Sequence, residues 1–134
     1  MTMSRQTTSG PATGRSRSAA LRGEVWIADL DPVRGRELGM KPRPVLILSS
    51  NAMNQGAFER VIVVPSTSVS HDIPCHVEWS TVRPIDRKRI TGYFACEDIR
   101  SISVERLERR ILSQVTAGVM ANVQDWIRNL LDLH

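Results

Sequence analysis

Two predicted strands on either side of one irregular loop, between Arg22 and Ser50, constrain the fold more than any other feature of the sequence. The segment Glu24–Asp29 alternates apolar and polar residues, as a half-buried strand does. The segment Val45–Leu48 is continuously apolar and β-favouring, which predicts a more buried strand. The residues between them that interrupt regular structure are Pro32, Gly35, Gly39 and Pro42. Loops held between strands often carry binding and catalytic groups.

The rest of the chain predicts further short strands and one helix. Polar, turn-like stretches at 49–56, 67–74 and 81–91 separate the candidate strands, and the last of these stretches is basic. The predicted strands are Val61–Pro65, Cys75–Trp79, Gly92–Cys96 and one near Arg110–Leu112. Apolar residues then recur at helical spacing, at Val119, Met120, Val123, Ile127, Leu130 and Leu131. This pattern predicts a C-terminal amphipathic helix with Ser113 or Thr116 as its N-cap.

The positive charge of the chain is concentrated in local clusters. Three of its 18 basic residues, Arg5, Arg15 and Arg17, lie near the N-terminus; the remaining 15 stand against 14 acidic residues. Affinity for nucleic acid must therefore come from clusters of basic residues, for which a solvated surface is the alternative interpretation. The charged residues of the first loop are Arg34, Arg36, Glu37, Lys41 and Arg43. The second cluster is Arg83, Arg87, Lys88 and Arg89.

Residues 1–21 differ in composition from the rest and predict a disordered basic tail, or an upstream choice of start codon, ahead of one domain over 22–134. No signal sequence or stretch of about 18 apolar residues is visible, so we expect a soluble, cytoplasmic protein without a membrane span. Cys75 and Cys96 are expected to be free thiols. The run His71–His76 lacks the spacing of a structural metal site, so no metal or other cofactor is expected.

Several motifs, in order along the chain, give the sequence a recognisable pattern. They are Arg22-Gly23-Glu24-Val25-Trp26, Asp29-Leu30-Asp31-Pro32, Gly35 followed by Glu37, Arg43-Pro44-Val45-Leu46, Val63-Val64-Pro65 ahead of Thr67-Ser68, and Ile99-Arg100-Ser101-Ile102 ahead of Glu105-Arg106-Leu107. With these motifs the chain resembles the MazF/PemK family, the toxins of bacterial toxin–antitoxin pairs. The resemblance covers 22–134 and implies a mainly β fold with α, a small SH3-like (CcdB/MazF-type) β-barrel with a C-terminal amphipathic helix.

The resemblance also implies an activity and partners. Such toxins are endoribonucleases (mRNA interferases) that cut single-stranded RNA selectively and without a metal, which inhibits translation and growth. The ribose 2′-hydroxyl attacks the adjacent phosphorus and leaves a 2′,3′-cyclic phosphate and a 5′-hydroxyl. The implied partners are single-stranded RNA, a cognate antitoxin and a second copy of the chain in a homodimer.

Three residues match catalytic positions of the family. Arg43 matches its catalytic arginine, and a guanidinium can grip a phosphate through two hydrogen bonds. Glu37 matches a loop glutamate that serves some members as a base, while the alternative is an acid that only offsets neighbouring arginines. Thr67, with Ser68 beside it, matches a pair of hydroxyl residues, which could instead be simple turn caps. The expected catalytic residues are Arg43, Thr67 and Glu37.

The substrate-binding residues implied by the resemblance are Ser68, Arg34, Arg36, Glu97 and Asp98. The chain departs from the family at several of its sites. Glu37 and Arg43 are one residue further apart than in the members compared, and Ala95 replaces an arginine that is catalytic in one branch. Glu97 stands where that branch has aspartate. Asp98 replaces a glutamine that reads a base edge, and because Asp accepts but does not donate, the substrate preference should differ.

Two other classes of function fit the same barrel. One is a gyrase-poisoning toxin that binds a topoisomerase without catalysis, and the other is an inactive RNA-binding barrel. The Arg22–Trp26 opening, with Arg43-Pro44 and Thr67-Ser68, favours the nuclease. Trp26 and Trp126 are expected to pack in the core or a dimer interface, whereas Trp79, near polar loops, could pack or stack on RNA bases.

Overall fold

The computed structural model describes residues 20–31, 35 and 41–134, so most of the predicted tail and most of the first loop lie outside the described residues. Its strands are β1 (Val25–Ala28), β2 (Arg43–Ile47), β3 (Arg60–Thr67), β4 (His76–Val82), β5 (Arg89–Ala95), β6 (Arg100–Ser103) and β7 (Leu107–Leu112). Its helices are α1 (Asn51–Asn54) and α2 (Ala117–Leu131), with the 3₁₀ turns η3 (Cys96–Asp98) and η4 (Val104–Arg106).

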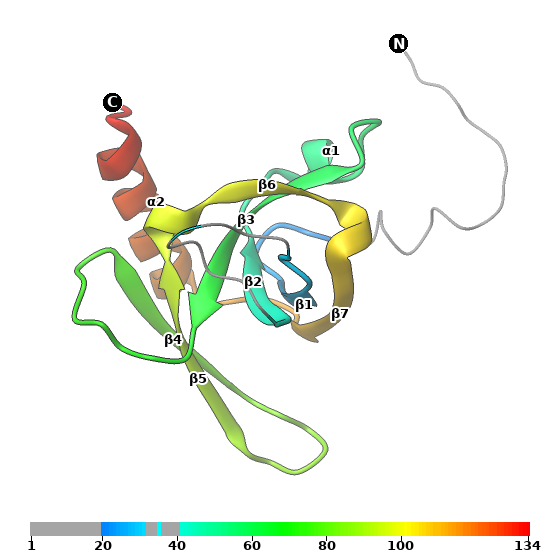
Figure 1. Cartoon of the computed structure of the whole chain (residues 1–134), viewed down its shortest axis with the longest axis vertical. Helices are drawn as coiled ribbons and strands as arrows, with labels where there is room; N and C mark the ends of the chain where they lie inside the picture. The colour runs from blue at the N-terminus through cyan, green and yellow to red at the C-terminus, as the bar shows by residue number, and fades with distance from the viewer. Residues whose placement is uncertain (1–19, 32–34, 36–40) are drawn as a thin grey trace, which may run out of the picture.

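The described strands form one antiparallel sheet that curls around a core (Figure 1). The strand order is β4-β5-β3-β2-β1-β7, and β6 pairs with β3 beside that path. The chain passes from β6 through η4 into β7, which pairs with β1. Within the described residues β6 and β7 are not paired with each other, so the barrel is left open at that corner. The predicted fold, a small β-barrel with a C-terminal helix, is otherwise confirmed.

The central position of β3 explains its continuous apolar sequence. This strand pairs with β2, β5 and β6, and its residues from Val63 to Thr67 are buried. Both faces of β2 and β3 are covered, because Leu46 and Val64 pack in one apolar cluster while Val45 and Val63 pack in the other. Strands covered on both faces have continuous apolar runs rather than alternation.

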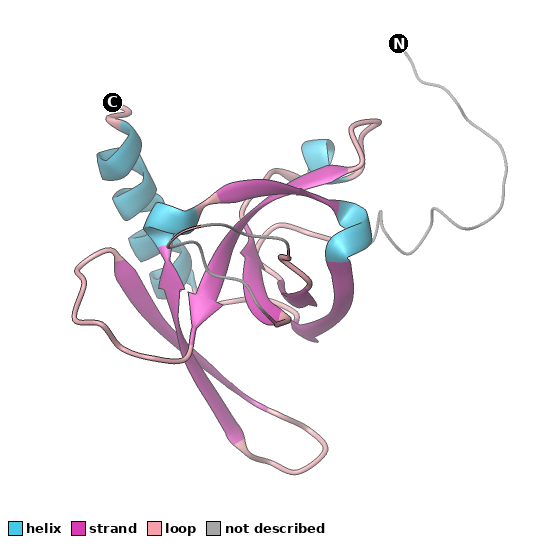
Figure 2. Ribbon diagram, viewed as in Figure 1, coloured by secondary structure: helices cyan, strands magenta, loops and turns pink. Residues whose placement is uncertain are grey.

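The C-terminal helix α2 covers one side of the sheet (Figure 2). Val123 and Ile127 on its apolar face are buried in the same cluster as Leu46 and Phe94. Thr116 is the N-cap, because its Oγ1 accepts a hydrogen bond from the backbone N of Val119 at 3.2 Å. The predicted helix and the second of its two candidate caps are therefore confirmed. No helix in the described part of the chain is long and apolar enough to cross a membrane.

The hairpin β4–β5 is longer than the sequence predicts. The pairing runs from His76 opposite Ala95 to Val82 opposite Arg89, so both ends of the stretch 81–91 are strand and the turn is confined to 83–88. The hairpin extends away from the barrel in Figure 1. The stretch 81–91 was predicted as a loop because it is polar, but its two ends pair with each other across the hairpin and therefore form strand. A second difference is the short helix α1, capped by Ser50, within the stretch 49–56 predicted as a turn.

Candidate active site

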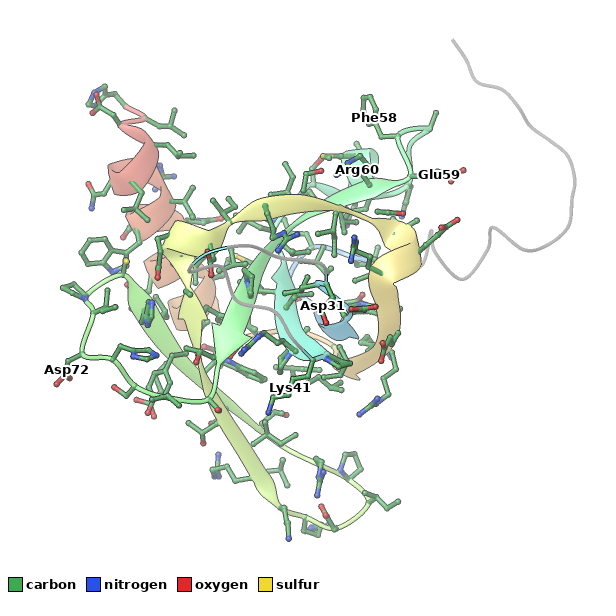
Figure 3. All side chains as sticks on the ribbon, in the orientation of Figure 1. Asp31, Lys41, Phe58, Glu59, Arg60 and Asp72 are labelled. Atoms are coloured by element: carbon green, nitrogen blue, oxygen red, sulfur yellow. The ribbon has the colours of Figure 1, made fainter. Side chains whose placement is uncertain are left out.

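A pocket of about 240 Å³ lies at one edge of the sheet, where the C-terminal ends of β3 and β5 meet the loop before β4. Figure 3 shows Asp72 projecting from that loop and Lys41 ahead of β2, on the opposite side of the molecule from Phe58, Glu59 and Arg60. The residues that line the pocket are Thr67, His71, Ile73, His76, Ala95, Glu97 and Asp98.

The pairing of β2 with β3 brings the two expected catalytic residues of the described chain to this edge. Val45 pairs with Pro65 in this antiparallel pair. Arg43 is two residues before Val45 and Thr67 is two residues after Pro65, so both lie at the same end of the two strands. Arg43 is half-buried, and its Nη1 donates a hydrogen bond to the carbonyl oxygen of Ser66 at 3.4 Å. A cation held beside a pocket that contains a hydroxyl can bind a phosphate oxygen.

Thr67 lies in the pocket wall, whereas Ser68 does not. Only 6% of Thr67 is exposed, and its Oγ1 accepts a hydrogen bond from the backbone N of Val69 at 3.3 Å. The hydroxyl hydrogen of Thr67 can still point toward a ligand. Ser68 is exposed and is not among the residues that line the pocket.

Trp79 forms a buried support behind this edge and is not a surface for RNA stacking. Only 3% of it is exposed, and its ring stacks on that of Phe94 with a centroid separation of 5.0 Å. Its Nε1 donates to Ser66 Oγ at 2.8 Å, which fixes the residue next to Thr67. Gly92 is required here, because an added Cβ would overlap Ser66 Oγ and lie 2.8 Å from Trp79 Nε1.

Glu97 is held by two neighbouring residues of the chain segment that enters β4. His76 Nε2 lies 2.8 Å from Glu97 Oε2, and the Cys75 thiol donates to Glu97 Oε1 at 3.3 Å. The His76 side chain is 6% exposed and that of Glu97 is 45% exposed. Cys75 was not predicted to belong to the site, and His76 could be a proton donor by sequence alone, although a structural or solvated histidine is the commoner case. The signal that could have revealed them is the pairing of β4 with β5, which places Cys75 and His76 beside Cys96 and Ala95.

The hydrogen bonds around Glu97 change its acidity and that of both cysteines. Burial acts to raise the pKa of Glu97, but the bond with His76, together with bonds from backbone and Cys75, outweighs it and lowers that pKa. Burial, and then the bond to Glu97, raises the pKa of Cys75. Burial raises the pKa of Cys96 to about 12, so it stays a thiol. Both cysteines are free, as expected.

Asp98 also lines the pocket, as does Ala95, which stands where one branch of the family has an arginine. The expected roles of Glu37, Arg34 and Arg36 fall on residues outside the described part of the chain. Among the described residues, no three His, Cys, Asp or Glu side chains are grouped as a metal site would require.

Comparison with known proteins identifies the family. Residues 21–131 match the model of the PemK-like, MazF-like toxins of type II toxin–antitoxin systems. Endoribonuclease MazF9 of Mycobacterium tuberculosis is 36% identical over 120 residues, which cover 84% of this chain and 96% of the relative.

Solved structures agree with this assignment. MazF from Deinococcus radiodurans superposes with a TM-score of 0.69 at 27% identity, covering 85% of this chain and 97% of that one. A mycobacterial endoribonuclease in complex with its cognate antitoxin gives 0.67 at 27% identity, covering 87% and 98%. The chain therefore belongs to the PemK-like, MazF-like toxins of type II toxin–antitoxin systems and is an endoribonuclease of that family.

Proposed function

We propose that this toxin cuts single-stranded RNA at selected sequences by attack of the ribose 2′-hydroxyl on the adjacent phosphorus. The observation that carries the proposal is the placement of Arg43 and Thr67 at one end of β2 and β3, with Thr67 in the wall of the pocket. This pair supplies a cation and a hydroxyl donor for one phosphate. Cleavage of RNA in the cytoplasm would stop translation and growth.

The proposed reaction forms the bond between the 2′-oxygen and phosphorus and breaks the bond between phosphorus and the 5′-oxygen. A base takes the proton of the 2′-hydroxyl, and an acid gives a proton to the departing 5′-oxygen. Negative charge builds on the phosphorane oxygens, where Arg43 and Thr67 would stabilise it. Glu37 is our candidate base, on the motif alone. Glu97, Asp98, Ser68, Arg34 and Arg36 are our candidates for holding the substrate.

Cleavage should not require a metal, because the nucleophile belongs to the substrate. Purified protein incubated with a long single-stranded RNA in excess EDTA is expected to cut it at selected sites. The products should carry 5′-hydroxyl ends that polynucleotide kinase labels without prior phosphatase treatment. Loss of cutting in EDTA with recovery in magnesium would contradict this mechanism.

The same assay separates this proposal from the two other functions compatible with the barrel. Binding without cutting would indicate an inactive RNA-binding protein. Neither binding nor cutting, combined with capture of gyrase, would indicate a topoisomerase poison. A matched reaction with Arg43→Ala protein shows whether any cutting comes from this site or from a contaminating nuclease.

We further propose that the protein is a homodimer and that an antitoxin silences it by covering the site. The solved mycobacterial relative is in complex with its cognate antitoxin. The first loop is rich in arginine and leads directly into Arg43, so an acidic flexible segment would have a complementary surface there.

The antitoxin is expected to compete with RNA. Adding it to toxin loaded with a non-cleavable RNA should release the RNA, and adding excess RNA should slow antitoxin binding. The neighbouring arginines Arg34, Arg36 and Arg43 should become protected from an arginine-specific reagent. An antitoxin that contacts only the exposed face of α2 and leaves RNA binding unchanged would contradict this arrangement.

A further inference from the structure

The part of the pocket lined by Glu97 and Asp98 is suited to a group that donates hydrogen bonds, whereas the phosphate is assigned to Arg43 and Thr67 at the paired ends of β2 and β3. Among the described residues that line the pocket are two acids, Glu97 and Asp98, and no lysine or arginine. A phosphate would bring negative charge close to these carboxylates, which costs free energy. Donor groups have acceptors available instead, since an ionised carboxylate only accepts. The pair of Arg43 and Thr67 and the acidic part of the pocket therefore suit different parts of a nucleotide.

The carboxylate of Glu97 is fixed and yet still accessible. His76 holds one of its oxygens and Cys75 holds the other, while 45% of the side chain remains exposed. Each carboxylate oxygen has two lone pairs, so each can accept one more hydrogen bond from a ligand. Because the side chain is already ordered, a ligand does not have to order it on binding, and that increases affinity.

His76 is not placed for stability alone. Because the pKa of Glu97 is lowered, the carboxylate is ionised at neutral pH, and the proton in the bond must come from His76 Nε2. The other ring nitrogen, Nδ1, is buried without a hydrogen-bond partner in the described structure. A buried unsatisfied polar atom costs free energy. The His71 ring contacts His76 edge-on, with centroids 5.8 Å apart. The bond from His76 Nε2 to Glu97 is therefore retained although Nδ1 of the same ring has no hydrogen-bond partner in the described structure.

We propose that this pocket is a nucleobase subsite that selects a base with an amino group, with Glu97 as the accepting residue and His76 as its positioning residue. Guanine fits best, because its N1–H and N2–H₂ are adjacent donors that match the two oxygens of one carboxylate. Adenine and cytosine each offer one amino group. Uracil is disfavoured, since the single donor on its pairing edge lies between two carbonyl acceptors that would face the carboxylate. This inference rests on the proposed function, in which RNA is the substrate.

The main test is a change of base preference. The protein is incubated with single-stranded RNA randomised around the cut sites, and the sequences of the cut ends are read. One position close to the cut is expected to be depleted of uracil by about tenfold or more. In Glu97→Gln protein the amide can donate as well as accept, so uracil should become accepted at that position. The matched control is Glu108→Gln on β7, an exposed acid outside the pocket, which should keep the wild-type preference.

A second readout isolates the positioning role of His76. In His76→Leu protein the pKa of Glu97 should return toward its usual value, so the acid limb of the pH–cleavage profile should move to higher pH. His76→Gln retains a donor at a similar reach and should restore part of the wild-type profile. Circular dichroism on both variants separates this effect from unfolding, and if His76→Leu fails to fold, the comparison of His76→Gln with wild type still applies.

Three outcomes would overturn the inference or its positioning role, and a fourth, a protein that cuts no RNA, would overturn the proposed function instead. An unchanged base preference in Glu97→Gln would remove the subsite, and pH profiles that coincide in the His76 variants would remove the positioning role. If the protein cuts no RNA at all, the affinities of four non-cleavable 2′-O-methyl oligonucleotides that differ in one base still test the pocket. Equal affinities there would overturn the subsite.

Discussion

Replacing Arg43 with alanine is expected to lower the rate of RNA cleavage by a factor of about 100 or more while the fold is retained. Arg43 is half-buried at the start of β2, and its guanidinium is bonded to Ser66, the residue before Thr67 in the pocket wall. From there it can stabilise the negative charge that develops on the phosphorane oxygens. The measurement is the single-turnover rate on a defined RNA, with circular dichroism to verify folding. Arg109→Ala, an exposed arginine on β7, is the matched control and should cut at the wild-type rate.

Arg43→Lys is expected to recover only a small part of the lost rate. A lysine keeps the positive charge, but its ammonium does not reproduce the two parallel hydrogen bonds of a guanidinium to a phosphate. Full recovery by lysine would mean that only the charge matters. A near-normal rate in Arg43→Ala would remove this residue from the catalytic group, and the nuclease would then depend on residues of the first loop.

Replacing Phe94 with alanine is expected to lower the free energy of unfolding by about 3–5 kcal/mol. Phe94 is fully buried, packs in the cluster that α2 covers and stacks on Trp79, which in turn holds Ser66. Removing the ring leaves a cavity and takes away the support of the strand that carries Thr67. The measurement is urea unfolding followed by tryptophan fluorescence.

Phe94→Leu is the comparison variant for this prediction, since it keeps most of the apolar volume and should lose much less stability. Cleavage by the leucine variant, assayed well below its unfolding midpoint, shows whether the Trp79–Ser66 support affects the site apart from stability. A loss below about 1 kcal/mol in Phe94→Ala would mean that the neighbouring side chains close the cavity.

The local pattern of apolar residues was sufficient to predict those strands and the helix whose burial can be read within one segment of the chain. The apolar runs of β2 and β3 predicted buried strands because both faces of those strands are covered in the structure. The helical spacing after Thr116 predicted α2 because only one face of that helix is buried. The motifs singled out Arg43 and Thr67, and the pairing of β2 with β3 brings them to one edge.

Tertiary structure alone decided the surroundings of Glu97, the extent of the β4–β5 hairpin and the position of Trp79. His76 and Glu97 are 21 positions apart, and nothing local to either residue indicates the other. They meet because the first residue of β4, His76, pairs with the last residue of β5, Ala95, from which the chain enters η3. Trp79 lies near polar loops in the sequence, yet the alternation of β4 turns it inward onto Phe94. The sequence by itself determined which segments are buried, since burial follows from local composition, whereas the partners of a side chain depend on strand pairing, which joins residues far apart in the chain.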